Sequence, residues 1–412
     1  MILILAAALL ETIIDCHNNG DFIGYITAGN AVLNGEDIYF DYLNTWPPFF
    51  SLVSVPLALL DKVAPITLRF VWILGSWVVI FFIMKMAIKI FLQKNLLMPF
   101  KKAYSDSELE FQTSYVMVPL ILSLRMFIDN NIHLQINLYM LLLATASLYY
   151  YYNNHTVLAA SILAFSIAIK VYTIFLLLYF LYKRAFKFSL WTLVFVIVFM
   201  ASTFLFFGTD AIYYHNFWIE DNVLAMPPSN HMNQSLQALL MRLFTDAETG
   251  MDFSINIASL PFVTLKRWYY VLVLMVGIYP LLAFKSKLIP TDTSITQIIQ
   301  WAILFCVIPI LSPVAWKYYY VFLWLPIFVF NYFVFQQKIL KGTKYAKLAK
   351  GFFYASLPGL IFSSELFVGM YYSDVMEVYG VNTIGAILLL FSLFILYHAV
   401  QKQGKKEVLL NS

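Results

Sequence analysis

The chain has 412 residues, of which 62% are hydrophobic and 12% are charged, and its formal net charge is +4. Soluble domains are nearer half apolar and a quarter charged, so this composition, with a mean hydropathy of +0.78, excludes an ordinary soluble protein. The basic residues lie in short loops rather than on one face of a soluble module, and the two cysteines are isolated. Nucleic-acid binding, a disulfide framework and a zinc site built on cysteine are therefore not expected.

Apolar runs along the whole chain predict an all-α integral membrane protein with about twelve transmembrane helices, within a range of roughly ten to thirteen. The predicted spans are residues 1–14, 49–60, 67–92, 113–127, 133–151, 156–182, 188–207, 268–284, 295–311, 318–335, 351–371 and 381–400. No soluble module or internal repeat interrupts this pattern in the sequence, so we expect one polytopic domain over residues 1–412.

The apolar segment at residues 1–14 is too short to cross about 30 Å of hydrocarbon unaided. It also lacks the basic region and the small-residue cleavage site of a signal peptide. We expect a first helix that is short at its N-terminus, and a natural start upstream of Met1 would explain its length.

The acidic stretch DFIGYITAGNAVLNGEDIYFDYLNTWPPFF, residues 21–50, follows this segment. From Asp21 to Leu33 the spacing of apolar residues predicts a helix that ends at Gly35. We expect this helix to lie on the membrane surface in the first outer loop, with Asp21 at its start. There the carboxylate would be placed to act as a general base, or it would simply anchor the helix. Glu36, Asp37 and Asp41 are predicted to be ordinary solvated loop residues.

Basic clusters at residues 183–187, 285–287, 338–350 and 402–406 predict cytoplasmic loops and a cytoplasmic C-terminus. The loops at residues 208–266, 312–317 and 372–380 would then face outward. The N-terminal half fits this rule less well, because the loop with Lys94, Lys101 and Lys102 would lie outside. The alternative is that segment 156–182 breaks near Lys170 into two half-helices, with the earlier spans inverted.

Lys170 lies in the middle of the apolar run AFSIAIKVYTIFLLLYF. A cation at the centre of a membrane helix costs roughly 3 kcal/mol, and such residues usually have a function. A lipid phosphate is the natural anionic partner. The alternative is that the side chain extends to an interface.

Other polar residues also lie at the ends of predicted spans. Gln135 and Asn137, in NIHLQINLY, would bind substrate or make hydrogen bonds between helices. Arg125 and Asp129 are one helical turn apart, which favours a structural ion pair.

Two motifs border the predicted outer loops of the C-terminal half. NHMNQS places Asn233 and Gln234 where they would bind a sugar or cap the next helix. LSPVAWKYYY places Trp316, Lys317 and Tyr318 at an outer boundary, where an aromatic belt is the simpler explanation.

The sequence contains no phosphate-binding glycine loop, no D-x-D motif for a metal-bound nucleotide sugar, and no convincing metal-ligand spacing. We therefore expect no cofactor. A metal would be optional, because lysines can neutralise a phosphate leaving group.

Six stretches, in this order, resemble the polyprenol-phosphate-dependent glycosyltransferases of the membrane-embedded C-type fold, in particular bacterial glycosyltransferase family 87, which includes mannosyltransferases. They are DFIGYITAGNAVLNGEDIY, WPPFFSLVSVPLALL, LQINLYMLLL, IAIKVYTIFLLLYFLYKR, NQSLQALLMRLF and LSPVAWKYYYVFLWLP. Three departures stand out: the family's K-x-Y-P is KVYT here, G-Q-x-N is LQIN, and the customary histidine of SPxSWxHY is replaced by Tyr318 or displaced by Lys317.

The resemblance implies an inverting enzyme with an acidic base in its first outer loop, which matches Asp21. It implies donor-phosphate contacts by Lys170, Tyr172, Lys317 and Tyr318. The remaining substrate-binding candidates are Tyr25, Gln135, Asn137, Asn233, Gln234 and Trp316.

The expected function is transfer of a hexosyl unit, mannosyl being one candidate, from a polyprenyl-phosphate sugar to a hydroxyl of a lipid or glycan acceptor. The site would face the exterior of a bacterial plasma membrane. Two alternatives stay open: a polysaccharide polymerase or O-antigen ligase, and a transporter or flippase for lipid-linked sugars. The large outer loop fits the first alternative, but it is poor in the arginines and histidines on which such enzymes rely. A transporter would be expected to show repeats.

Overall fold

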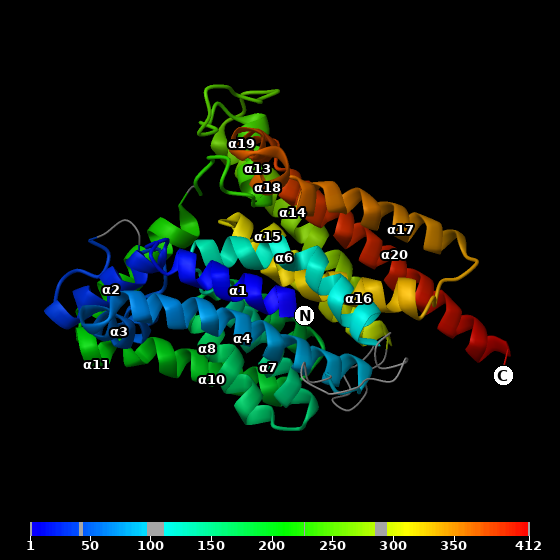
Figure 1. Ribbon diagram of the computed structural model, residues 1–412, viewed down its shortest axis with the longest axis horizontal. Helices are drawn as coiled ribbons and strands as arrows, with labels where there is room; N and C mark the ends of the chain where they lie inside the picture. Colours follow the sequence, from blue (N-terminus) through cyan, green and yellow to red (C-terminus); the bar gives the residue numbers. More distant parts are fainter. Residues whose placement is uncertain (1, 41–43, 97–110, 226, 285–294, 411–412) are drawn as a thin grey trace. The chain divides into compact units, whose positions relative to one another are not determined.

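The computed structural model describes residues 2–40, 44–96, 111–225, 227–284 and 295–410. Over these ranges the fold is all-helical and contains no β-strand (Figure 1). An isolated β-bridge joins Asn233 and Trp316. The all-α prediction is confirmed for this part of the chain. Asp41, Lys101, Lys102, Lys285 and Lys287, which entered the loop and topology predictions, lie outside the described residues.

The chain groups into two compact units. The first unit contains residues 1–99, 127–226 and 288–291, and the second contains residues 100–126, 227–287 and 292–412. The helix α6 (Val118–Ile132) begins in the second unit and ends in the first. The expectation of one domain over residues 1–412 stays a prediction.

In the first unit, α2 packs on α3, α4 packs on both α1 and α7, and α8 packs on both α7 and α10 (Figure 1). Its elements are α1 (Ile2–Asp15), α2 (Phe22–Asn34), α3 (Pro48–Val63), α4 (Pro65–Leu92), α7 (Asn137–Tyr152), α8 (Thr156–Ile169), η2 (Val171–Thr173), α9 (Ile174–Tyr182), α10 (Phe186–Ser202), α11 (Phe204–Phe207), α12 (Asp210–Trp218) and η3 (Ile219–Leu224).

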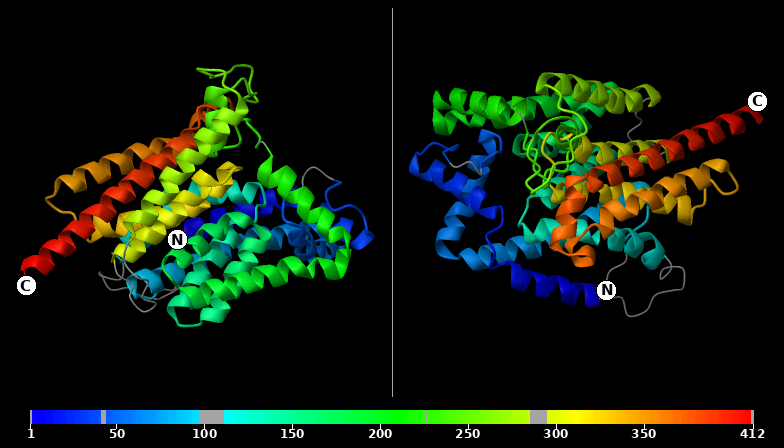
Figure 2. Two further views of the ribbon diagram at one scale, coloured as in Figure 1. Left: turned by 180° about the vertical axis from the view of Figure 1, so that it is seen from behind. Right: turned by 90° about the horizontal axis from the view of Figure 1, so that it is seen from above.

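The second unit is centred on α20, which runs beside α15 and α17 (Figure 2). Its elements are η1 (Phe111–Met117), α13 (Leu236–Phe244), α14 (Phe262–Ala283), α15 (Ile295–Leu311), η4 (Lys317–Leu323), α16 (Trp324–Phe330), η5 (Asn331–Gln336), α17 (Lys344–Leu357), η6 (Pro358–Phe362), α18 (Glu365–Val368), α19 (Met370–Val378) and α20 (Val381–Leu410).

Among the described residues, four helical segments are long and apolar enough to cross a membrane: Pro65–Leu92, Phe186–Phe207, Lys317–Gln336 and Val381–Lys402. Three shorter apolar helices, Thr156–Ile169, Val171–Tyr182 and Ile295–Leu311, fall within predicted spans. These helices indicate a membrane protein, as the composition predicts. The count of about twelve crossings and the C-type fold stay predictions.

Two predicted spans are interrupted. The segment 156–182 is broken at Lys170, whose backbone is extended between α8 and η2, as the alternative topology predicted. The segment 351–371 is not one continuous helix, because α17 ends before Pro358 and the chain turns at Ser363 and again at Gly369, where φ is +78°. Proline cannot donate the helical hydrogen bond, and a positive φ favours glycine.

The loop helix predicted from Asp21 to Leu33 is α2, and it ends at Gly35 in the left-handed conformation. The helix is buried on more than one side, since Phe22, Ala28 and Ala31 are all buried. A Cβ added at Gly29 would lie 2.5 Å from the carbonyl oxygen of Ser54 in α3. The glycine therefore allows α2 to pack closely on α3, and a position of α2 on the membrane surface stays a prediction.

Candidate active site

Three segments of the first unit bring polar side chains together: the start of α2, the start of α7, and the break between α8 and η2. A main-chain contact fixes the first two, because the amide of Asp21 donates to the carbonyl oxygen of His133 at 3.1 Å. Gly20 has a φ of +48°, and a Cβ there would lie 2.7 Å from the same oxygen. Glycine is required at this position because the two backbones approach so closely.

Asp21 is linked to α7 through the side chain of Gln135. The Nε2 of Gln135 donates to Oδ2 of Asp21, and the hydroxyl of Tyr25 donates to Oε1 of Gln135 at 3.1 Å. The same hydroxyl accepts from the amide of Ile136 at 3.2 Å. Asp21 precedes α2 but makes no side-chain cap to it, so its carboxylate is directed to Gln135.

Asn137 links this group to the broken helix. Its Oδ1 accepts from Nζ of Lys170 at 3.0 Å and from the hydroxyl of Tyr172 at 2.8 Å. Its Nδ2 lies 3.4 Å from Oε1 of Gln135. The chain of hydrogen bonds thus runs from Asp21 through Gln135 and Asn137 to Lys170 and Tyr172.

The two ends of this network carry opposite charges. Asp21 is partly exposed, whereas Lys170 is 6% exposed. The Asp21 carboxylate attracts the Lys170 ammonium electrostatically. A partly exposed carboxylate can act as a general base, and a buried ammonium can stabilise negative charge that develops on a leaving group. We refer to Asp21, Tyr25, Gln135, Asn137, Lys170 and Tyr172 as the polar network of the first unit.

In the second unit, Asn233 and Gln234 are fully buried and bond mostly to the main chain. Asn233 donates to the carbonyl oxygens of Pro228 at 2.8 Å and Pro313 at 3.3 Å, and it accepts from the amide of Ala315 at 3.0 Å. Gln234 donates to the carbonyl oxygens of His231 at 2.5 Å and Glu377 at 2.7 Å. These bonds hold the loop before α13, and sugar binding by these residues stays a prediction.

Lys317, predicted to contact a phosphate, pairs with carboxylates of the same unit. Its Nζ lies 2.9 Å from Oε1 of Glu365 and 3.7 Å from Oε1 of Glu377. Trp316 forms the β-bridge to Asn233, and Tyr318 is buried. The structure therefore brings six of the predicted site residues into one hydrogen-bonded network in the first unit and places the other five in the second.

A model of glycosyltransferase family 87 matches residues 44–313. The chain belongs to glycosyltransferase family 87. A search of curated proteins and a search of solved structures each returned no match. Membership in family 87 indicates that the protein is a glycosyltransferase and supports the resemblance drawn from the motifs. Gln135, Asn137, Lys170 and Tyr172 lie inside the matched range, whereas Asp21 precedes it and Trp316, Lys317 and Tyr318 follow it.

Sequence reasoning missed the role of Arg242 in this family 87 protein. The guanidinium is fully buried and donates to five main-chain oxygens, those of Ser229, Asn230, Asn233, Glu377 and Val378, at 2.8–3.3 Å. Burial lowers the pKa of Arg242 to about 10, so it stays charged at neutral pH. One feature of the sequence could have indicated its burial: Arg242 follows Leu239 by three residues and so lies on the apolar face of α13.

Arg125 makes contacts that the sequence did not predict. Its Nη1 donates to Oγ of Ser363 at 2.6 Å and lies 3.4 Å from Oδ1 of Asn382. Arg125 therefore joins α6 to the segments around η6 and α20 in the second unit, while its predicted ion pair with Asp129 stays a prediction.

Proposed function

We propose that this protein transfers a hexosyl unit from a polyprenyl-phosphate sugar to a hydroxyl of a lipid or glycan acceptor, with inversion at the anomeric carbon. The observation that carries the proposal is the polar network of the first unit. It joins a partly exposed carboxylate to a buried lysine through two amide side chains.

In the proposed mechanism, Asp21 accepts the proton of the acceptor hydroxyl as that oxygen attacks the anomeric carbon. The bond from the anomeric carbon to the phosphate oxygen breaks, and the phosphate leaves with the electron pair. Lys170 and Tyr172 stabilise the negative charge that develops on the phosphate. Gln135 and Asn137 hold the acid and the cation in position, and Tyr25 fixes Gln135.

The remaining assignments are also proposals. Lys317 and Tyr318 would contact the donor phosphate, and Trp316, Asn233 and Gln234 would contact a sugar. The enzyme would act in a bacterial plasma membrane with the site on its outer face, and mannose is one candidate sugar. No nucleotide sugar is required, because the donor already carries its phosphate on a lipid.

The test is a transfer assay with purified protein in lipid nanodiscs, a panel of labelled polyprenyl-phosphate hexoses, the matching nucleotide sugars, and extracted lipid and glycan acceptors. We expect turnover with at least one lipid-phosphate sugar and none with the nucleotide sugars. The product linkage, measured by NMR, should have the anomeric configuration opposite to that of the donor. Turnover with nucleotide sugars alone, or retention of configuration, would contradict the proposal.

A further inference from the structure

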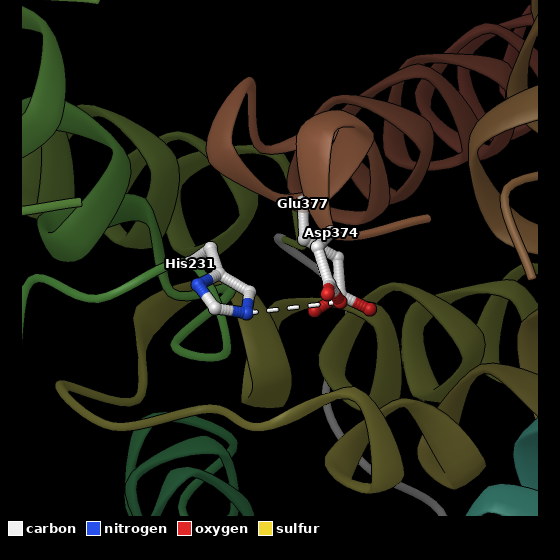
Figure 3. Close-up of side chains that lie close together, drawn as sticks. All are labelled: His231, Asp374 and Glu377. Carbon is white, nitrogen blue, oxygen red and sulfur yellow. Dashed lines mark ion pairs between the residues drawn. The ribbon is translucent and has the colours of Figure 1, made fainter. Parts of the chain in front are cut away.

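A group of metal-ligating side chains lies outside the polar network, in the second unit. His231, from the loop before α13, points toward Asp374 and Glu377 of α19 (Figure 3). One nitrogen or oxygen atom from each of the three residues lies within 4.8 Å of the others. Asp374 and Glu377 are three residues apart, so they lie on the same face of α19. We refer to these three residues as the His231 cluster.

The imidazole of His231 is held as a metal-binding histidine usually is. Its amide donates to the carbonyl oxygen of Thr249 at 2.7 Å, and its Nδ1 lies 3.2 Å from the same oxygen. A carbonyl oxygen only accepts, so Nδ1 carries the hydrogen and Nε2 of the neutral ring presents a lone pair. Nε2 is the atom that faces Asp374, at 3.7 Å. A ring nitrogen donating to a carbonyl while the other faces a ligand site is the usual arrangement around bound metals.

The two elements that carry the cluster are fixed to each other. Gln234 donates to the carbonyl oxygens of both His231 and Glu377, and Arg242 donates to that of Glu377 at 3.3 Å and that of Val378 at 2.8 Å. The backbone positions of the three ligands are thus set before any ion binds. Pre-organisation of this kind reduces the cost of binding a ligand.

The charge and the solvent exposure of the three side chains in the His231 cluster also suit the binding of a cation. The side chain of Glu377 is 2% exposed, whereas those of His231 and Asp374 are 13% and 27% exposed. The His231–Asp374 separation of 3.7 Å exceeds hydrogen-bond distance, so the contact is not a direct hydrogen bond. Lys317 lies 3.7 Å from Glu377 but 2.9 Å from Glu365, so it can remain on Glu365 while an ion takes Glu377.

We infer that the His231 cluster binds one divalent transition-metal ion, with Zn²⁺ as the best match. Nitrogen and carboxylate ligands lie about 2.0–2.2 Å from Zn²⁺, so side-chain movements on the order of 1 Å would close the group around the ion. Three protein ligands leave a fourth position open, and the exposure of Asp374 gives it access to solvent. Mg²⁺ and Ca²⁺ prefer sites made of oxygen ligands alone.

The test measures Zn²⁺ binding by the full-length protein in detergent, with any affinity tag removed and metal stripped by a chelator. After dialysis against buffered Zn²⁺, we expect one equivalent per chain by mass spectrometry, with no displacement by excess Mg²⁺. Competition with a fluorescent indicator should show affinity losses of about tenfold or more in His231→Gln and Asp374→Asn. The matched control is Asp252→Asn, which removes an exposed carboxylate of the same unit that lies outside the cluster and should leave the affinity unchanged.

Two further measurements separate loss of a ligand from loss of folding. The thermal midpoint of each metal-free variant should equal that of the metal-free parent. With Co²⁺ in place of Zn²⁺, the visible absorption bands should change in His231→Gln and remain unchanged in Asp252→Asn. Less than half an equivalent of bound Zn²⁺ would overturn the inference. Parental affinity in Asp374→Asn, or an equal loss in Asp252→Asn, would also overturn it.

Discussion

The two units use the same polar residue types in different ways. In the first unit, Gln135 and Asn137 bond to other side chains, those of Asp21, Tyr25, Lys170 and Tyr172. In the second unit, the side chain of Gln234 donates to main-chain oxygens, and the side chain of Asn233 makes all four of its described hydrogen bonds with the main chain.

This difference separates a reactive arrangement from an architectural one. Side chains that bond to one another can exchange those partners for a substrate, because the backbone does not depend on them. Side chains that bond to buried main-chain groups cannot be exchanged without leaving those groups unpaired, at a cost of about 1–3 kcal/mol each. Substitutions of Gln135 or Asn137 should therefore reduce activity more than stability. Substitutions of Asn233 or Gln234 should reduce stability in addition to any effect on substrate binding.

The largest effect on stability is expected for Arg242→Met. The change removes donors to five main-chain oxygens, three of them in buried hydrogen bonds, which should lower the free energy of unfolding by at least ~3 kcal/mol. The measurement is the thermal midpoint and the folded yield in detergent. Arg242→Lys should recover part of the loss, since an ammonium has three donors and cannot reach all five oxygens. A folded yield equal to that of the parent would show that Arg242 does not organise this loop.

A matched pair of asparagines tests the comparison directly. Asn233→Ala should cost about 2–4 kcal/mol of stability, because it leaves the carbonyl of Pro228 and the amide of Ala315 without their described partner. Asn137→Ala should reduce transfer about 10–100-fold through misplacement of Lys170, with a much smaller change in thermal midpoint. The comparison would fail if the two variants lost stability equally and kept equal specific activity.

Substitutions of Lys170 test whether the polar network of the first unit binds the donor. Lys170→Met should weaken binding of the lipid-phosphate donor about 10–100-fold, which corresponds to the loss of a charged hydrogen bond of about 1.5–3 kcal/mol. Lys170→Arg should restore part of the affinity, because the guanidinium differs in reach and shape. The measurement is donor binding to folded protein by isothermal titration calorimetry in nanodiscs. Parental donor affinity in Lys170→Met would remove this residue from the donor site.

The smallest effect is expected for Tyr25→Phe. The change removes the hydroxyl that donates to Gln135 and accepts from the amide of Ile136, at a cost of about 1 kcal/mol. We expect kcat/KM to fall a few-fold. If Tyr25 positions Gln135, the fall should come from a lower kcat. A rise in acceptor KM with kcat unchanged would instead indicate direct contact with the acceptor.

Much of the fold could be predicted from the sequence. Apolar runs located most of the helices, and Asn34-Gly35 located the end of α2. The break at Lys170 was foreseen as an alternative, because the basic residues of the N-terminal half fit the positive-inside rule poorly. The turns at Ser363 and Gly369 were missed, since the residues around them are as apolar as a membrane helix.

The candidate sites were predictable to different extents. The polar network was found because Lys170, Gln135 and Asn137 are costly in apolar helices and each stands out alone. The His231 cluster was missed, since His231 and Asp374 are far apart in sequence and no ligand spacing links them. Arg242 was not singled out, because its five main-chain partners come from segments that only the tertiary fold brings together.

The central claim is that Asp21 is the general base of a transferase, and Asp21→Asn tests it most directly. The change keeps the shape of the side chain and an oxygen that can accept from Gln135, but it removes the proton acceptor. Transfer from the polyprenyl-phosphate sugar found to be active should fall about 10²–10⁴-fold, while donor affinity and thermal midpoint stay near those of the parent. Asp37→Asn, which changes an acid of the same loop that accepts from the amide of Tyr39, should retain full activity. Near-parental turnover in Asp21→Asn would contradict the claim.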